Sequence, residues 1–91
     1  MYKIEKIIKL SLGTSAQTVK VNGLACLIQN NSDSASVYFK EKRDDGKTVT
    51  TSNGYKLAAG KETVIPLVAL ELSIISDTAS TDVRVMILEE A

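Results

Sequence analysis

The apolar positions of the chain are densest in its last third, where short polar breaks separate three runs. The runs cover residues 62–68, 70–76 and 82–89 and are rich in Val, Ile and Leu. Branched residues of this kind suit a pleated, half-buried surface, so each run predicts a strand. In the last run one face is wholly apolar and the other becomes apolar toward its end, which predicts a strand inside a sheet. Pro66 cannot donate to a ladder, so the first of the three strands should lie at an edge or carry a bulge.

The N-terminal segment, residues 2–12, fits more than one pattern. Its second half alternates as in a strand, whereas apolar positions of its first half also fit one face of a helix. The excess of Ile and Leu favours a strand. A regular strand would point Lys6 inward beside Ile8. We therefore predict either a bulge near Lys6–Ile7 or an arm formed by residues 1–6.

Between these ends, short apolar segments alternate with turn residues. Residues 24–29 are almost continuously apolar, which predicts a strand buried on both faces, and residues 35–42 alternate as in a half-buried strand. Asn30–Ser34 is typical of a polar loop. The Thr-rich segment Thr48–Thr51 has little to bury and predicts an edge strand, closed by a turn at Asn53–Gly54.

These segments add up to about eight strands, with a turn every 8–12 residues or so and no convincing helix. That spacing indicates a β-sandwich or a small barrel, and we favour the sandwich. The sequence therefore predicts an all-β fold, a single small β-sandwich of the jelly-roll or immunoglobulin-like type. We expect residues 10–91 to form this domain, with residues 1–9 as an N-terminal arm or as the first strand.

Charge is balanced over the whole chain but unevenly placed along it. With a formal net charge of +0, 44% hydrophobic and 24% charged residues, the chain is neither a disordered polyelectrolyte nor a general nucleic-acid binder. Residues 1–20 hold four Lys and one Glu, whereas residues 62–91 hold six acidic residues and one Arg. Opposite charges across neighbouring strands attract, so we predict that the first strand lies beside the last.

The side chains offer no constellation that carries catalysis. The chain has no His, no Trp and one Cys, which excludes His-based triads, Cys–His pairs and zinc clusters. The lone thiol, Cys26, fits a small core residue. The adjacent carboxylates Asp44–Asp45 and Glu89–Glu90 fit a solvated turn and a solvated tail. We therefore expect a protein without enzymatic activity, cofactor or metal.

Membranes and nucleic acids are also poor partners for this sequence. No stretch approaches the roughly 18 apolar residues that cross a bilayer, and the N-terminus lacks the pattern of a signal peptide. The aromatic residues are three Tyr and one Phe, which is few for stacking bases in a basic groove. We expect the protein in the cytoplasm or in a particle assembled there.

Four segments resemble small structural proteins of tailed bacteriophages, and the resemblance covers Leu10 to Glu89. The segments are Ile28–Ser32, Ser36–Phe39, Thr51–Glu62 and Thr81–Leu88. The resemblance implies a compact β-sandwich that decorates the head shell in many copies, or a related domain of a head fibre. Residues 2–9 depart from the family's pattern.

The resemblance implies a non-enzymatic virion protein, assembled in the host cytoplasm, that binds the major capsid protein, another virion protein or its own copies. Two alternatives stay open: a head-fibre or tail-tip subunit that recognises glycan, and a cytoplasmic phage-encoded regulatory protein. Edge strands offer unpaired backbone groups to a neighbour, so we expect the contact at the N-terminal segment, at the Thr-rich edge or at the strand that contains Pro66. The candidate interaction residues are Tyr2, Lys3, Ile4, Lys6, Ile7, Thr48 and Thr50.

Overall fold

The computed structural model describes residues 2–42, 46–66 and 69–90. Within these ranges the chain forms eight strands and no α-helix, which confirms the predicted all-β class. The strands are β1 (Tyr2–Leu12), β2 (Gln17–Asn22), β3 (Ala25–Asn30), β4 (Val37–Glu41), β5 (Tyr55–Leu57), β6 (Glu62–Pro66), β7 (Ala69–Ser76) and β8 (Thr81–Glu90). The predicted turn at Asp44–Asp45 lies outside the described residues.

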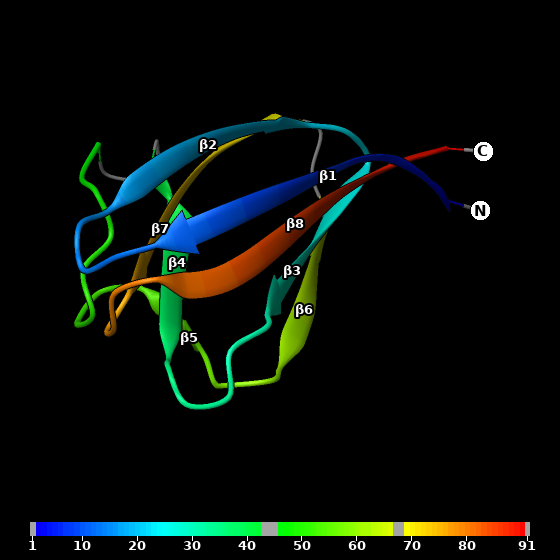
Figure 1. Cartoon of the computed structure of the whole chain (residues 1–91). Helices are drawn as coiled ribbons and strands as arrows, with labels where there is room; N and C mark the ends of the chain where they lie inside the picture. The colour runs from blue at the N-terminus through cyan, green and yellow to red at the C-terminus, as the bar shows by residue number, and fades with distance from the viewer. Residues whose placement is uncertain (1, 43–45, 67–68, 91) are drawn as a thin grey trace.

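The strands pack as two four-stranded antiparallel sheets (Figure 1). Their orders are β1-β8-β3-β6, called sheet A here, and β2-β7-β4-β5, called sheet B. The first strand pairs with the last, the second with the seventh, the third with the sixth and the fourth with the fifth. One long hairpin has thus been wrapped into a sandwich, which is the jelly-roll arrangement. An immunoglobulin fold would instead pair the first strand with the second.

The core lies between the two sheets and is built by alternation along each strand. In β8, Val83, Val85 and Ile87 are buried, while the residues between them are half-buried on the opposite face. β8 lies between β1 and β3, so the predicted interior position of this strand is confirmed. The other large buried side chains of the core cluster include Leu12, Val21, Ile28, Val37, Phe39, Leu57, Leu72 and Ile74.

The N-terminal segment, expected as an arm or as a first strand, lies in β1 from Tyr2 onward, and it pairs with β8 along its whole length. The predicted neighbourhood of the first and last strands is therefore correct. Lys3 lies directly opposite Glu89, an opposite-charge pair of the kind that favours this pairing. The N-terminal end of β1 lies beside the C-terminal end of β8, where Tyr2 is opposite Glu90 (Figure 1).

A β-bulge interrupts β1 between Ile4 and Lys6, slightly before the predicted position. A bulge adds one residue to one strand only, so it changes which side chains share a face. Ile4 is opposite Leu88, and Ile7 is opposite Met86, so both isoleucines lie on the outer face of sheet A. Lys6 stays on the inner side, opposite Ile87, but is exposed because β1 is an edge strand.

The segment Thr48–Thr51 is not a strand, contrary to prediction. Side chains satisfy its backbone in place of a ladder: the Val49 N–H donates to Ser73 Oγ at 2.9 Å, and the Thr50 N–H donates to Asn53 Oδ1 at 2.6 Å. Val49 is buried, 1% exposed. The two edges of sheet B are instead β2 and the three-residue strand β5.

Asn30 was expected in a solvated loop but is completely buried at the end of β3. Its Nδ2 donates to the carbonyl oxygens of Ala35 at 2.9 Å and Leu57 at 3.0 Å. Its Oδ1 accepts from the Ser32 N–H at 3.2 Å. One amide therefore ties the loop after β3 and the end of β5 to the edge of the core, because a buried Asn is tolerated only when its polar atoms are paired.

Candidate protein-interaction surface

The outer face of sheet A carries two adjacent rows of apolar side chains that cross all four strands. Residues directly opposite each other in an antiparallel pair point to the same side, so the register of the three strand pairs places each row. The first row is Ile4, Leu88, Ala25 and Pro66, and the second is Ile7, Met86, Leu27 and Val64, each in the order β1, β8, β3, β6. We call these eight residues the apolar face.

Four of the eight residues of the apolar face are exposed, three are half-buried and Ala25 is buried. Ile4 is 57% exposed, Ile7 50% and Val64 54%. Isolated exposed apolar residues are common on soluble proteins, but a contiguous group across a sheet indicates a contact surface. The alternation of β8 explains the position: its inward residues build the core, and its outward residues Met86 and Leu88 are apolar as well.

The next row along the strands is polar, and its charge changes from positive to negative across the sheet. It consists of Lys9, Arg84, Gln29 and Glu62, again in the order β1, β8, β3, β6. The row therefore begins with two cations at the β1 side and ends with an anion at the β6 side. Lys9 and Glu62 are both exposed. This row borders the apolar face.

Asp82 lies one step further along β8, where it anchors the polar end of the sheet. Its carboxylate accepts from Asn31 Nδ2 at 2.9 Å and from Arg84 Nη2 at 3.2 Å. These hydrogen bonds, the one from Asn31 first, hold the pKa of the Asp82 carboxyl below its ordinary value of 3.8. Both the orientation of Arg84 and the loop after β3 are thereby fixed at this border.

The outer face of sheet B is covered, unlike that of sheet A. Residues 46–54 lie against it: the backbone of Val49 bonds to Ser73 of β7, and Val49 is buried. A β-carbon at Gly54 would meet Val49 Cγ2 at 2.5 Å and Tyr38 Cβ at 3.0 Å, so this segment packs directly on β4. One sheet thus has a loop over its outer face, and the other presents apolar side chains.

The predicted interaction residues fall into two separate groups. Ile4 and Ile7 belong to the apolar face, and Lys3 and Lys6 are exposed on the same strand. The side chain of Tyr2 lies outside the described structure. Thr48 and Thr50 are exposed, but they belong to the segment over sheet B and are not brought together with the β1 residues.

The edges of the sandwich are poor sites for adding a strand, except for β2. β1 carries a bulge and three lysines, Lys3, Lys6 and Lys9, which are devices that keep edges from pairing. β5 has three residues, and β6, the other edge of sheet A, ends at Pro66. The predicted edge position of the Pro66 strand is confirmed. The face of sheet A is consequently a better docking surface than its edges.

Sequence reasoning named two members of the apolar face and missed the other six. The missed members are Ala25, Leu27, Val64, Pro66, Met86 and Leu88. The signal available in the sequence was the second apolar face of the last strand. That face predicts only that the strand lies inside its sheet, and a single-sequence pattern does not say which residues of the neighbouring strands extend the face.

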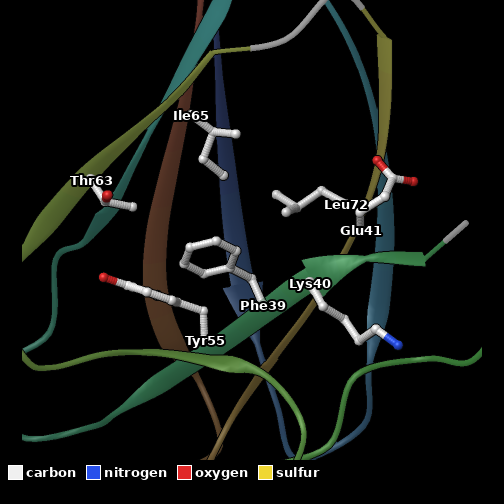
Figure 2. Close-up of a pocket in the computed structure, with 7 residues that line it drawn as sticks. All are labelled: Phe39, Lys40, Glu41, Tyr55, Thr63, Ile65 and Leu72. Atoms are coloured by element: carbon white, nitrogen blue, oxygen red, sulfur yellow. The ribbon is translucent and has the colours of Figure 1, made fainter. Parts of the chain in front are cut away.

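A pocket of about 420 Å³ opens at the side of the sandwich where β5 and β6 end the two sheets (Figure 2). The Phe39 and Tyr55 rings form its wall, with centroids 5.3 Å apart. Its lining residues are Phe39, Lys40, Glu41, Tyr55, Thr63, Ile65 and Leu72. In Figure 2 the polar ends of Lys40 and Glu41 point away from the two rings. The pocket can therefore receive an apolar or flat group of modest size.

Compared with known proteins, the chain matches no family, no curated protein and no solved structure.

Among the described residues, no three of the types Cys, Asp and Glu gather as metal ligands would. A search of the same residues finds no helix long and apolar enough to cross a membrane. Cys26 is buried, and burial raises the pKa of its thiol to about 11.

Proposed function

We propose that the protein is a non-enzymatic structural component of a tailed-bacteriophage virion, a decoration protein held on the head in many copies by contact with the major capsid protein and with its neighbours. The observation that carries the proposal is the apolar face. Seven of its eight side chains, all except the buried Ala25, are at least partly open to water, which is costly for apolar groups in register on one sheet and is accounted for by a partner surface.

The jelly roll supports the same proposal by analogy of fold alone. Viral capsid proteins and lectins use this architecture, and it serves many other functions too. A domain of 91 residues has a net stability of only about 5–14 kcal/mol. Attachment to a shell would add to that stability by linkage, because the shell binds the folded form only.

Quantitative mass spectrometry of purified virions tests the proposal. We expect the chain in hundreds of copies per particle, by order of magnitude, as symmetry of a shell requires. A few copies would indicate a fibre or tail-tip subunit instead. Absence from the particle would refute a virion role and favour the regulatory alternative.

The pocket favours glycan recognition as a second candidate function. Tyr55 is 64% exposed and leans on Phe39, so one aromatic ring is held in place at the mouth of the pocket. A rigid aromatic ring with one polar end is a common surface for binding sugars. Titration of the isolated protein with host-surface oligosaccharides, followed by NMR, should shift the Tyr55 ring signals. Unchanged spectra at millimolar sugar would remove this candidate.

A further inference from the structure

We infer that the partner of the apolar face is a second copy of this chain, and that two copies pack sheet A against sheet A around a two-fold axis parallel to the strands. The inference deepens the proposed function by naming the first neighbour of each copy. It concerns the isolated protein, so it can fail while the virion role stands.

The register of sheet A determines what such an axis brings together. The axis runs along the strands, between the two copies, and passes midway between β8 and β3. A half-turn about it places β1 of one copy over β6 of the other and β8 over β3, and each row of one copy lies over the same row of the other. Ile7 then faces Val64, and Met86 faces Leu27. The two mean strand directions coincide, which allows the aligned packing with a small twist that sandwiches use.

The first row is complementary in size under the same rotation. Leu88, the bulkiest residue of this row beside Ile4, faces Ala25, which has the smallest side chain of the apolar face and is 1% exposed within one copy. A large side chain over a small one avoids a clash between the two layers, so the new apolar burial in this row comes from Leu88, Ile4 and Pro66. By symmetry this contact forms twice.

The charged row selects a second copy over an unrelated apolar partner. Because the row runs from cation at β1 to anion at β6, the half-turn sets Lys9 of each copy opposite Glu62 of the other. Arg84 comes opposite Gln29, an uncharged acceptor. The surface is thus complementary to itself in charge as well as in apolar position, as an isologous interface must be.

The size of the surface indicates an interface that is reversible. Four strands about 4.8 Å apart and three rows about 7 Å apart cover roughly 400 Å² of each copy in projection, about half the area per partner of a standard stable interface and in the range of weak contacts. We therefore expect a dimer that dissociates on dilution in the micromolar range. Copies held on a particle would pair more completely, because attachment raises their effective concentration.

Sedimentation equilibrium of the full chain, from about 1 µM to about 1 mM, tests the pairing. We expect a monomer–dimer equilibrium in the wild type. Met86→Lys should abolish it, because the charge would be buried at the centre of the interface. The circular dichroism spectrum of this variant should match that of the wild type, since Met86 lies on the outer face.

A charge swap tests the axis itself. Lys9→Glu and Glu62→Lys should each weaken dimerisation about tenfold by opposing like charges twice, and the double variant should restore wild-type affinity. Lys20→Glu, an exposed site on β2 of the other sheet, is the matched control and should change nothing.

Two results would overturn the inference. A wild-type chain that stays monomeric to 1 mM or so would exclude the second copy as the occupant of the face. A dimer that the double charge swap fails to restore would exclude the proposed axis. The virion stoichiometry is measured separately, so neither result decides the proposed function.

Discussion

Replacing Asn30, the last residue of β3, by Ala should destabilise the fold. The side chain is 0% exposed and makes three hydrogen bonds, two to carbonyl oxygens and one from a backbone N–H. The backbone partners on Ala35 and Leu57 belong to buried residues. Truncation removes the Asn30 donor from the Leu57 carbonyl, whereas the Ala35 carbonyl still accepts from Ser32 Oγ at 3.2 Å. Each buried group left dry and unpaired costs about 1–3 kcal/mol.

The expected total is about 2 kcal/mol, because the Leu57 carbonyl loses its buried donor while the Ser32 end of the loop is only part-buried and can regain water. That is about a seventh to two fifths of the whole free energy of unfolding. At a urea dependence of about 1.5 kcal/mol per M, the midpoint of unfolding should fall by about 1.3 M.

Urea unfolding followed by circular dichroism measures this shift. Asn31→Ala is the matched control, because the neighbouring amide is exposed and its single hydrogen bond, to Asp82, also lies in solvent. We expect the control to lose less than about 1 kcal/mol. A loss for Asn30→Ala no larger than that of the control would refute the role given to this amide.

Three further outcomes follow from the described contacts. Cys26, with its thiol pKa raised to about 11, should resist thiol reagents at about pH 8 in the folded protein and react fully in denaturant; equal rates would contradict its burial. The pKa of Asp82 is lower in the folded protein than in the unfolded chain, so its ionised carboxylate stabilises the fold above the unfolded pKa, and this stabilisation is lost as the pH falls through the folded pKa. Asp82→Asn should therefore lose less stability than the wild type below about pH 4. If the stability of both proteins fell in parallel with pH, the contribution assigned to Asp82 would be wrong. Gly54→Ala should cost about 1–3 kcal/mol in thermal or urea unfolding, because its β-carbon would meet Val49, whereas Gly13→Ala, with no atom within 4 Å, should be neutral.

The sandwich and several of its strand positions follow from the sequence because they depend on local pattern and long-range charge. The two apolar faces of β8 predicted its interior position in a sheet. The missing backbone N–H of Pro66 predicted that its strand lies at an edge or carries a bulge, and the strand lies at an edge. The opposite charges of the chain ends predicted that β1 lies beside β8. The choice between jelly roll and immunoglobulin order depends on which distant strands pair, and no local pattern contains that information.

The wrong predictions for Thr48–Thr51 and Asn30 have a common cause. In both places side chains make the hydrogen bonds that we expected a strand ladder or water to make. Asn53 and Ser73 satisfy the backbone of residues 49–50, so this segment needs no strand partner. Asn30 does the same for the loop after β3. Two of the bonds made by these side chains join residues far apart in the chain, Val49 with Ser73 over 24 positions and Asn30 with Leu57 over 27, and a single-sequence pattern does not report such pairs.

The candidate surface was only partly predictable for a similar reason. Ile4 and Ile7 were identified as contact residues, but as parts of an edge or an arm. Their membership of a face depends on one extra residue in β1, which brings both to the same side. Val64 and Leu27 join them only through a register that links four strands.

The nested pairing of the strands also fixes the order in which the domain can be completed. The innermost pair, β4 with β5, can form before β7 and β8 are synthesised, whereas β1 waits for β8, which follows the other seven described strands along the chain. Until β8 is inserted, β1 and β3 have no common neighbour and the core lacks Val83, Val85 and Ile87. Ribosome-bound chains should therefore remain open to proteases until the residues of β8 have emerged, as expected for folds dominated by distant contacts.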